Sequence, residues 1–214
     1  AQVSAKHAAL RWLWAEYGAF AYVPAEQIGF VASPDPYQYR TRMDYVASKG
    51  RFGLRRSGRF NHIVDLATCH LIPPPAFAAA WAVYERAMAL GLPDYNLRSH
   101  EGFLRYVVVR RSPQDTLLLA MVTSAPDPEG QRALLMEQVA AHALAQPAVA
   151  GFHWLVNDSL TDVSFGAPQR HWGPDLLEMK VGSRALAIGS VVLPPGLTAE
   201  GMARITKGSD VLVT

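Results

Sequence analysis

The sequence predicts an α+β domain in which helices pack against antiparallel sheet. Runs rich in β-branched and aromatic residues alternate with turn residues, a pattern typical of antiparallel strands. Three long segments instead carry apolar residues at helical spacing and end at glycine or proline. The order strand, strand, helix, strand in the second half favours helices packed on one sheet.

Size and composition narrow the class of protein. The 214 residues are 50% hydrophobic and 18% charged, which is enough for a core that needs no disulfide or metal. Cys69 is the only cysteine, so an internal disulfide is excluded and a reducing compartment is favoured. No run approaches about eighteen uncharged apolar residues, and the N-terminus lacks a signal-peptide pattern. We therefore expect a cytoplasmic protein with no membrane partner.

The first half predicts a helix, a three-stranded meander and a second helix. The expected elements are a helix over residues 3–20, strands over residues 39–47 and 52–56, a third strand that ends at residues 63–66, and a helix over residues 77–90. Turns at Lys49-Gly50 and Ser57-Gly58 separate the three strands. Three prolines precede the second helix, and Gly91 ends it.

The second half predicts a hairpin, a helix and further strands. The expected elements are strands over residues 103–110 and 116–123, a helix over residues 128–146, strands over residues 152–156, 162–165, 176–181 and 184–188, a short helix over residues 198–205 and a strand at the C-terminal end. The SPQD sequence has turn composition, and Gly182-Ser183 suits a tight hairpin. We expect residues 1–190 to form one domain and residues 191–214 a tail or the start of another.

Basic residues are concentrated in the meander. Between Arg40 and Arg59 there are seven basic residues and one acid, Asp44, although the whole chain carries a net charge of only +2. Six of the seven are arginines, which can hold phosphates with two hydrogen bonds, and aromatic residues lie between them. This pattern predicts a surface that contacts RNA phosphates and stacks unpaired bases. A solvated strand face of the same composition is an equally weighted alternative.

The common catalytic and metal motifs are absent from the sequence. It contains no GxGxxG, GxxxxGK[ST], HExxH or paired CxxC pattern, and its seven histidines form no i, i+4 metal pair. Cys69 and His70 are adjacent, so in a strand they would point to opposite faces. A buried structural role for Cys69 is therefore the better interpretation.

Several segments together resemble one family. Residues 39–71 read YRTRMDYVASKGRFGLRRSGRFNHIVDLATCHL, followed by GFLRYVVVRRS, LLLAMVT, GFHWLVND and WGPDLLEMKVGSRALAIG. In order and spacing they resemble the S-adenosylmethionine-dependent RNA (uracil-5-)-methyltransferases. The resemblance runs from about residue 3 to residue 189. It implies the central α+β domain of that family, which lies between a β-barrel module and a Rossmann-like catalytic domain and helps to hold the RNA.

The resemblance also implies roles for individual residues. Together with the charge pattern, it predicts RNA recognition by these arginines: Arg40, Arg42, Arg55, Arg56, Arg59, Arg105 and Arg110. Cys69 corresponds to the fourth ligand of the 4Fe-4S cluster that many members carry, whose other ligands would precede this chain. One cysteine cannot hold such a cluster, so Cys69 is a ligand only if the others come from elsewhere.

The same resemblance leaves catalysis open. The SFFQ-type segment that contacts S-adenosylmethionine is replaced by AIGSVVLPPGLTAEGM, and the uracil-attacking cysteine would follow Thr214. We therefore assign no catalytic and no cofactor-binding residue in this chain. The first hypothesis is the RNA-recognition portion, or a stand-alone relative, of an RNA uridine C5 methyltransferase. Its expected partners are structured RNA (rRNA or tRNA) and a missing catalytic domain in cis, which would begin in residues 191–214.

Two alternatives come from other classes of function. One is a complete enzyme with divergent chemistry that uses the acids Asp158, Asp162 and Glu178. The other is a protein-interaction module whose tryptophans form an exposed patch. The tryptophans are Trp12, Trp14, Trp81, Trp154 and Trp172.

Overall fold

The structure is a computed structural model that describes residues 1–17, 23–127, 130–181 and 184–189. The chain divides into two compact units, Ala1–Pro36 and Tyr37–Thr214. In these ranges, no helix has the length and apolar character needed to cross a membrane. The expected helix over residues 198–205, the C-terminal strand and the proposed boundary at residue 190 fall outside the described residues or at their edge.

The first unit is a helix packed on a short return segment. Helix α1 spans Gln2–Tyr17 and is followed by a 3-10 turn, η1, over Ala25–Gln27. The indole Nε1 of Trp14 donates to the carbonyl of Val23 at 3.0 Å, and His7 Nε2 lies 2.9 Å from the carbonyl of Ile28. No residue of α1 is buried. The predicted helix is confirmed over residues 3–17, and its expected last turn lies outside the described residues.

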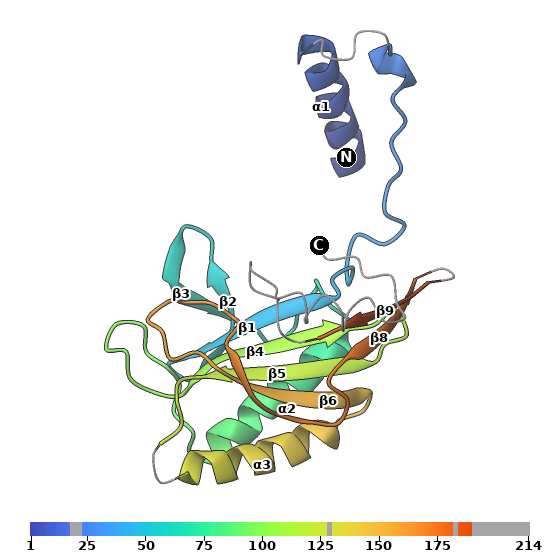
Figure 1. The fold of residues 1–214 in the computed structure, drawn as a ribbon. Helices are drawn as coiled ribbons and strands as arrows, with labels where there is room; N and C mark the ends of the chain where they lie inside the picture. The colour runs from blue at the N-terminus through green and yellow to red at the C-terminus, as the bar shows by residue number, and fades with distance from the viewer. Residues whose placement is uncertain (18–22, 128–129, 182–183, 190–214) are drawn as a thin grey trace, which may run out of the picture. The chain divides into compact units, whose positions relative to one another are not determined.

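The second unit is built on a seven-stranded sheet with the order β3-β2-β1-β4-β5-β6-β7 (Figure 1). The strands are β1 (Arg42–Ser48), β2 (Arg51–Arg56), β3 (Arg59–Asp65), β4 (Leu104–Arg111), β5 (Leu117–Thr123), β6 (Val149–Val156) and β7 (Ala167–Trp172). Strands β5 and β6 run parallel and are connected through a helix, whereas the other neighbours are antiparallel. The predicted α+β class and meander are confirmed.

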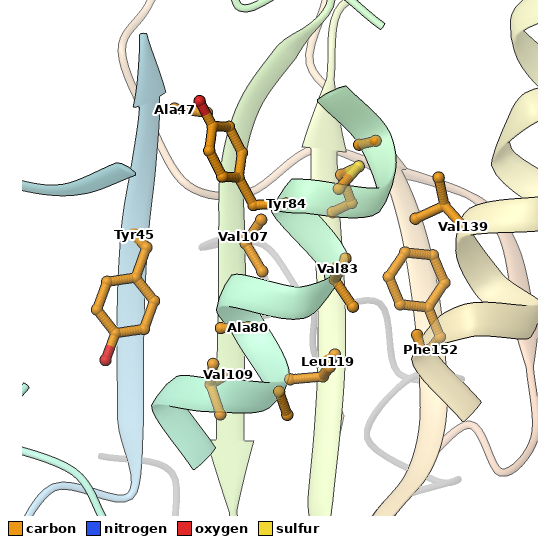
Figure 2. Packing of buried hydrophobic residues seen from close by; sticks show 14 of the residues in the cluster. Tyr45, Ala47, Ala80, Val83, Tyr84, Val107, Val109, Leu119, Val139 and Phe152 are labelled. Atoms are coloured by element: carbon orange, nitrogen blue, oxygen red, sulfur yellow. The ribbon is translucent and has the colours of Figure 1, made fainter. Parts of the chain in front are cut away.

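One face of the sheet is covered by helices α2 (Pro74–Ala89) and α3 (Gln131–Leu144), as Figure 1 shows; we call it the helix face. Figure 2 shows Val83 of α2 and Val139 of α3 packed over apolar strand residues such as Leu119 and Phe152. Helix α2 begins three residues before the predicted start, because proline suits the first turn, where a backbone N–H is not needed.

The opposite face carries a smaller apolar cluster and is crossed by residues 157–166; we call it the loop face. Its buried apolar residues are Val46, Ile63, Tyr106, Val108, Ala120, Val122 and Leu155. The prediction of a strand over residues 162–165 is wrong, because these residues form a loop. The guanidinium of Arg105 donates hydrogen bonds to the carbonyls of Asn157, Ser159 and Thr161. These backbone acceptors, just before residues 162–165, are therefore satisfied by a side chain and not by a neighbouring strand.

Beyond this loop the chain adds the edge strand β7 and a separate hairpin. Strand β7 was not predicted from the sequence, because its APQRHW residues are mostly exposed and include Pro168, which is tolerated here at the sheet edge. The predicted hairpin is confirmed as β8 (Leu177–Val181) and β9 (Arg184–Ile188), although its turn lies outside the described residues. The side-chain amide of Gln114, in the β4–β5 turn, donates to the backbone carbonyl of Lys180 and accepts from its backbone N–H. These two hydrogen bonds connect the hairpin to the sheet.

Candidate nucleic-acid interface

The β2–β3 hairpin pairs with β1 over only three residues, and a cleft lies where this pairing stops. Val46–Ser48 pair with Arg51–Gly53, after which β2 continues with β3 alone. A cleft of about 360 Å³ lies between β1, β2 and β4 on the loop face. It is lined by Asp44, Val46, Arg55, Tyr106 and the loop residues Asp162, Val163, Ser164 and Phe165. The structure therefore places two acids and one predicted RNA-contacting arginine in the same cleft.

Three polar groups meet in the wall of this cleft. Arg55 Nη2 lies 2.6 and 2.7 Å from the two carboxylate oxygens of Asp162, and the Tyr106 hydroxyl donates to Oδ1 at 2.6 Å. Arg55 Nη2 is also 3.5 Å from the Tyr106 hydroxyl. Burial raises the pKa of Tyr106 to about 12, and its hydrogen bond to Asp162 adds to the rise. Tyr106 is therefore a neutral donor at physiological pH, and its hydroxyl lies beside the Arg55 guanidinium.

A second pair of an arginine and an acid, Arg42 and Asp44, lies on β1. Arg42 reaches Asp44 with two hydrogen bonds, from Nε to Oδ1 at 2.8 Å and from Nη2 to Oδ2 at 3.0 Å. Ser164 of the loop donates to the same carboxylate at 2.5 Å. Arg110 is the partner of Arg42 across β1 and β4, and its guanidinium is half-buried. Burial lowers the pKa of Arg110, and the charge of Arg42 lowers it further.

Arg105 requires a correction to the predicted RNA surface. Its side chain is 2% exposed, and its guanidinium donates to the carbonyls of Asn157 and Ser159 at 2.7 Å and also to that of Thr161. It lies 4.3 Å from the centre of the Tyr95 ring. A cation committed to three carbonyls and one ring holds the loop in place, so we remove Arg105 from the set that contacts RNA directly.

The remaining predicted arginines are exposed. Arg40, Arg56 and Arg59 all face solvent, and the described part of the chain offers none of them an ion-pair partner. Lys49 and Arg51 are exposed as well. Exposed cations without a neighbouring acid keep their full field for an external anion.

Two exposed tyrosines lie just before Arg40 in the chain. Tyr37 and Tyr39 are each 59% exposed. The backbone of this segment is held against residues 70–71 by hydrogen bonds from Gln38 N to the carbonyl of His70 at 2.8 Å and from Arg40 N to that of Leu71 at 2.9 Å. Exposed rings on a fixed backbone are suited to stacking against unpaired bases.

The structure also reveals polar groups that the sequence analysis missed or placed elsewhere. Asp44 follows Arg42 by two residues on one strand, a spacing that puts both side chains on the same face and could have identified the pair. Tyr106 gave no such signal. Asp162 had been considered only as a catalytic acid, whereas here it is bound to Arg55, 107 residues away in sequence. Of the other two acids considered, Asp158 is exposed and Glu178 lies 3.5 Å from Lys180.

The metal and tryptophan predictions have different outcomes. Cys69 is buried next to Tyr45, and burial raises the pKa of the Tyr45 hydroxyl, with Cys69 adding to the rise. No group of three metal-ligating side chains occurs among the described residues, and one thiol does not fit a four-thiolate cluster. A ligand role that depends on other chains or domains stays a prediction. Trp81, Trp154 and Trp172 pack in or against the helix-face core and so form no exposed patch, whereas Trp12 is 62% exposed.

Known proteins are similar to this chain in both sequence and structure. A tRNA (uracil(54)-C(5))-methyltransferase of Pyrococcus abyssi is 26% identical over 159 residues, which cover 72% of this chain and 36% of that protein. The crystal structure of the P. abyssi tRNA (uracil-54, C5)-methyltransferase in complex with S-adenosyl-L-homocysteine matches with a TM-score of 0.59 and 25% identity, over 74% of this chain and 37% of that one. About three quarters of the chain is thus similar, in both sequence and fold, to one part of these tRNA (uracil-54-C5)-methyltransferases.

Other RNA methyltransferases show the same partial match. An uncharacterized RNA methyltransferase of Caldanaerobacter subterraneus subsp. tengcongensis is 33% identical over 105 residues, which cover 46% of this chain and 23% of that protein. No protein-family model matches the sequence. The chain thus spans about a third or less of the length of these RNA methyltransferases.

Proposed function

We propose that this chain is the substrate-RNA recognition portion of an RNA uridine C5 methyltransferase. The observation that carries the proposal is the exposed set of cations on the meander of a chain homologous to these enzymes: Arg40, Lys49, Arg51, Arg56 and Arg59. Each phosphate neutralised by such a side chain releases counterions, which supplies affinity without sequence specificity. Tyr37 and Tyr39 add aromatic faces for unpaired bases.

The chemistry of methyl transfer belongs to the rest of such an enzyme in this proposal. The P. abyssi structure contains S-adenosyl-L-homocysteine, the product form of the methyl donor. In our proposal the donor is held by a catalytic domain in cis, and this portion positions the RNA. The relatives from Pyrococcus are named for a tRNA uracil, which makes tRNA the first RNA to test and rRNA the second. The cytoplasmic location predicted from the single cysteine is part of the same proposal.

The test is a binding titration of the full chain with a tRNA transcript at several salt concentrations. With about four phosphates engaged, the logarithm of the association constant should fall against the logarithm of salt with a slope of about −3 to −4. Replacing Arg56 and Arg59 together by alanine should make this slope shallower by about two and weaken binding to all RNAs alike. An rRNA fragment titrated in parallel compares the two candidate substrates.

A double variant elsewhere serves as the matched control. Arg98→Ala with Lys180→Ala removes the same charge from two exposed positions outside the meander. It should leave the salt slope within about half a unit of the unmodified chain. The proposal fails if the chain binds no RNA at about 50 mM salt, or if both double variants make the salt slope shallower by the same amount.

A further inference from the structure

We propose that Arg55 and Tyr106 form a binding site for one RNA phosphate, and that the carboxylate of Asp162 occupies this site until RNA displaces it. This inference rests on the proposed function and deepens it. The meander then contacts RNA in two ways, with exposed cations that are always available and with one internal site that must first release its own acid.

The donors of this site converge as an oxyanion requires. Arg55 Nη2 reaches both carboxylate oxygens of Asp162, and the Tyr106 hydroxyl reaches one of them, all within 2.7 Å. Carboxylate and phosphate present similar oxygen geometry to a guanidinium, so donors that hold one can hold the other. Tyr106 is neutral and donates, which adds a hydrogen bond without adding charge.

The geometry around the donors leaves room for an exchange. The site opens into a cleft of about 360 Å³, and the Arg55 and Asp162 side chains keep 21% and 26% of their surface exposed. The residues before Asp162 are exposed, with Leu160 at 69%. The carboxylate can therefore withdraw toward solvent without disturbing the helix-face core.

A neighbouring pair shows what a permanent acid partner looks like. Asp44 lies on the same strand as Arg42, two residues away, and receives two hydrogen bonds from it and a third from Ser164. Strand geometry holds this acid beside its arginine in every state of the folded sheet. Asp162 is not a sequence neighbour of Arg55, and only the position of the loop brings the two side chains together.

The structure also shows how the loop stays anchored while Asp162 moves. Arg105 holds the carbonyls of Asn157, Ser159 and Thr161, which fixes the segment just before Asp162. At the other side, Ser164 is bound to Asp44. The exchange therefore involves the side chain of Asp162 and its immediate backbone, not the release of the whole loop.

The test compares two acids of the same segment in the full chain. Asp162→Asn removes the competing charge from the site, whereas Asp158→Asn removes an equal charge from an exposed position four residues earlier. Affinity for the tRNA transcript should rise about tenfold in D162N and less than about threefold in D158N. The salt slope should steepen by about one in D162N alone, because no displaced carboxylate is left to take up a cation in exchange for the one that the phosphate releases.

Two further variants separate the site from general electrostatics and from stability. In an Arg55→Ala background, D162N should no longer raise affinity beyond D158N, because the guanidinium that binds the phosphate is gone. Tyr106→Phe in the D162N background should lower affinity several-fold. D162N should also lower the thermal midpoint slightly, so that stability and RNA affinity change in opposite directions.

The outcomes distinguish this inference from the proposed function. Equal affinities for D162N and D158N, or a D162N gain that persists in the R55A background, overturn the internal phosphate site. In that case a salt slope that still depends on Arg56 and Arg59 leaves the proposed function standing. If the unmodified chain and D162N both fail to bind RNA, the proposed function fails, and the internal site fails with it.

Discussion

The two faces of the same sheet are built from alternate residues of the same strands, yet they are covered in different ways. On β1, Tyr45 points into the helix-face core, while Asp44 lines the cleft on the loop face. On β4, Val107 packs under α2 and Tyr106 donates to Asp162. Because successive side chains of a strand point to opposite faces, one sheet can bury an apolar core on one face and hold charged groups on the other.

The helices on one face and the loop on the other are held to the sheet by different kinds of interaction. Helices α2 and α3 are held by apolar contacts such as the stacking of Phe52 on Tyr84, whose ring centres are 4.8 Å apart. The loop over the other face is held by directional hydrogen bonds, which Arg105 and Tyr106 donate to loop residues and which Ser164 of the loop donates to Asp44. Apolar contacts tolerate small shifts, whereas each of these hydrogen bonds depends on one geometry.

The largest expected effect is on the helix face. Phe52→Ala should lower the free energy of unfolding by about 3–5 kcal/mol, because it empties a fully buried site among four aromatic neighbours. Urea unfolding followed by tryptophan fluorescence measures this loss. Val64→Ala on the adjacent strand is the control, since Val64 is 44% exposed and its loss should cost under about 1 kcal/mol. Similar losses in both variants would contradict the burial contrast.

The next effect concerns the anchor of the loop face. Arg105→Met should cost about 2–3 kcal/mol, because three carbonyls lose a charged donor while methionine keeps most of the volume. Amide exchange should accelerate in residues 157–164 more than in α2, since the loop loses its anchor and the helix face does not. Arg98→Met, at an exposed position, is the control. Equal acceleration on both faces would show that the loop is not an independent cover.

A smaller effect depends on pH. Burial lowers the pKa of His153 on the loop face and outweighs the hydrogen bond to the Pro174 carbonyl and the charge of Asp175, which raise it, so the folded state favours the neutral ring. His153 therefore contributes stability that is present above its unfolded pKa of about 6.5 and lost as pH falls through the lower folded value. His153→Asn should flatten this acid-side loss in thermal unfolding curves. His62→Asn, at an exposed position, should leave the curve unchanged, and a flattened curve there would contradict the assignment.

The smallest effect compares two adjacent residues. Arg55→Ala should cost about 1 kcal/mol, because it leaves Asp162 without its cation on the loop face. Arg56→Ala should cost under about 0.5 kcal/mol, because its side chain is exposed and has no acid partner among the described residues. Thermal unfolding of both variants checks this. A larger loss in R56A than in R55A would reverse the assignment of the two arginines.

Much of the fold could be predicted from the sequence. The meander, the hairpin of β4 and β5, and helices α2 and α3 were all expected within a few residues, because local turn and helix signals mark their ends. The loop over residues 162–165 and the edge strand β7 were not, since the loop takes its shape from a guanidinium over fifty residues earlier. The candidate site was predicted only in part, because a count of arginines does not show which of them meet an acid.

The sequence by itself determined where positive charge is concentrated and which residues alternate between the two faces, because both depend on residues close together in the chain. Only the tertiary structure decided what each arginine does. A register shift between Arg55 and Arg56 accompanies the separation of two adjacent cations, one held in the cleft by Asp162 and one left in solvent. Arg105 became a buried anchor because the loop after β6 folds back over β4. Contacts across 50 to 110 residues set these roles, and no local pattern encodes them.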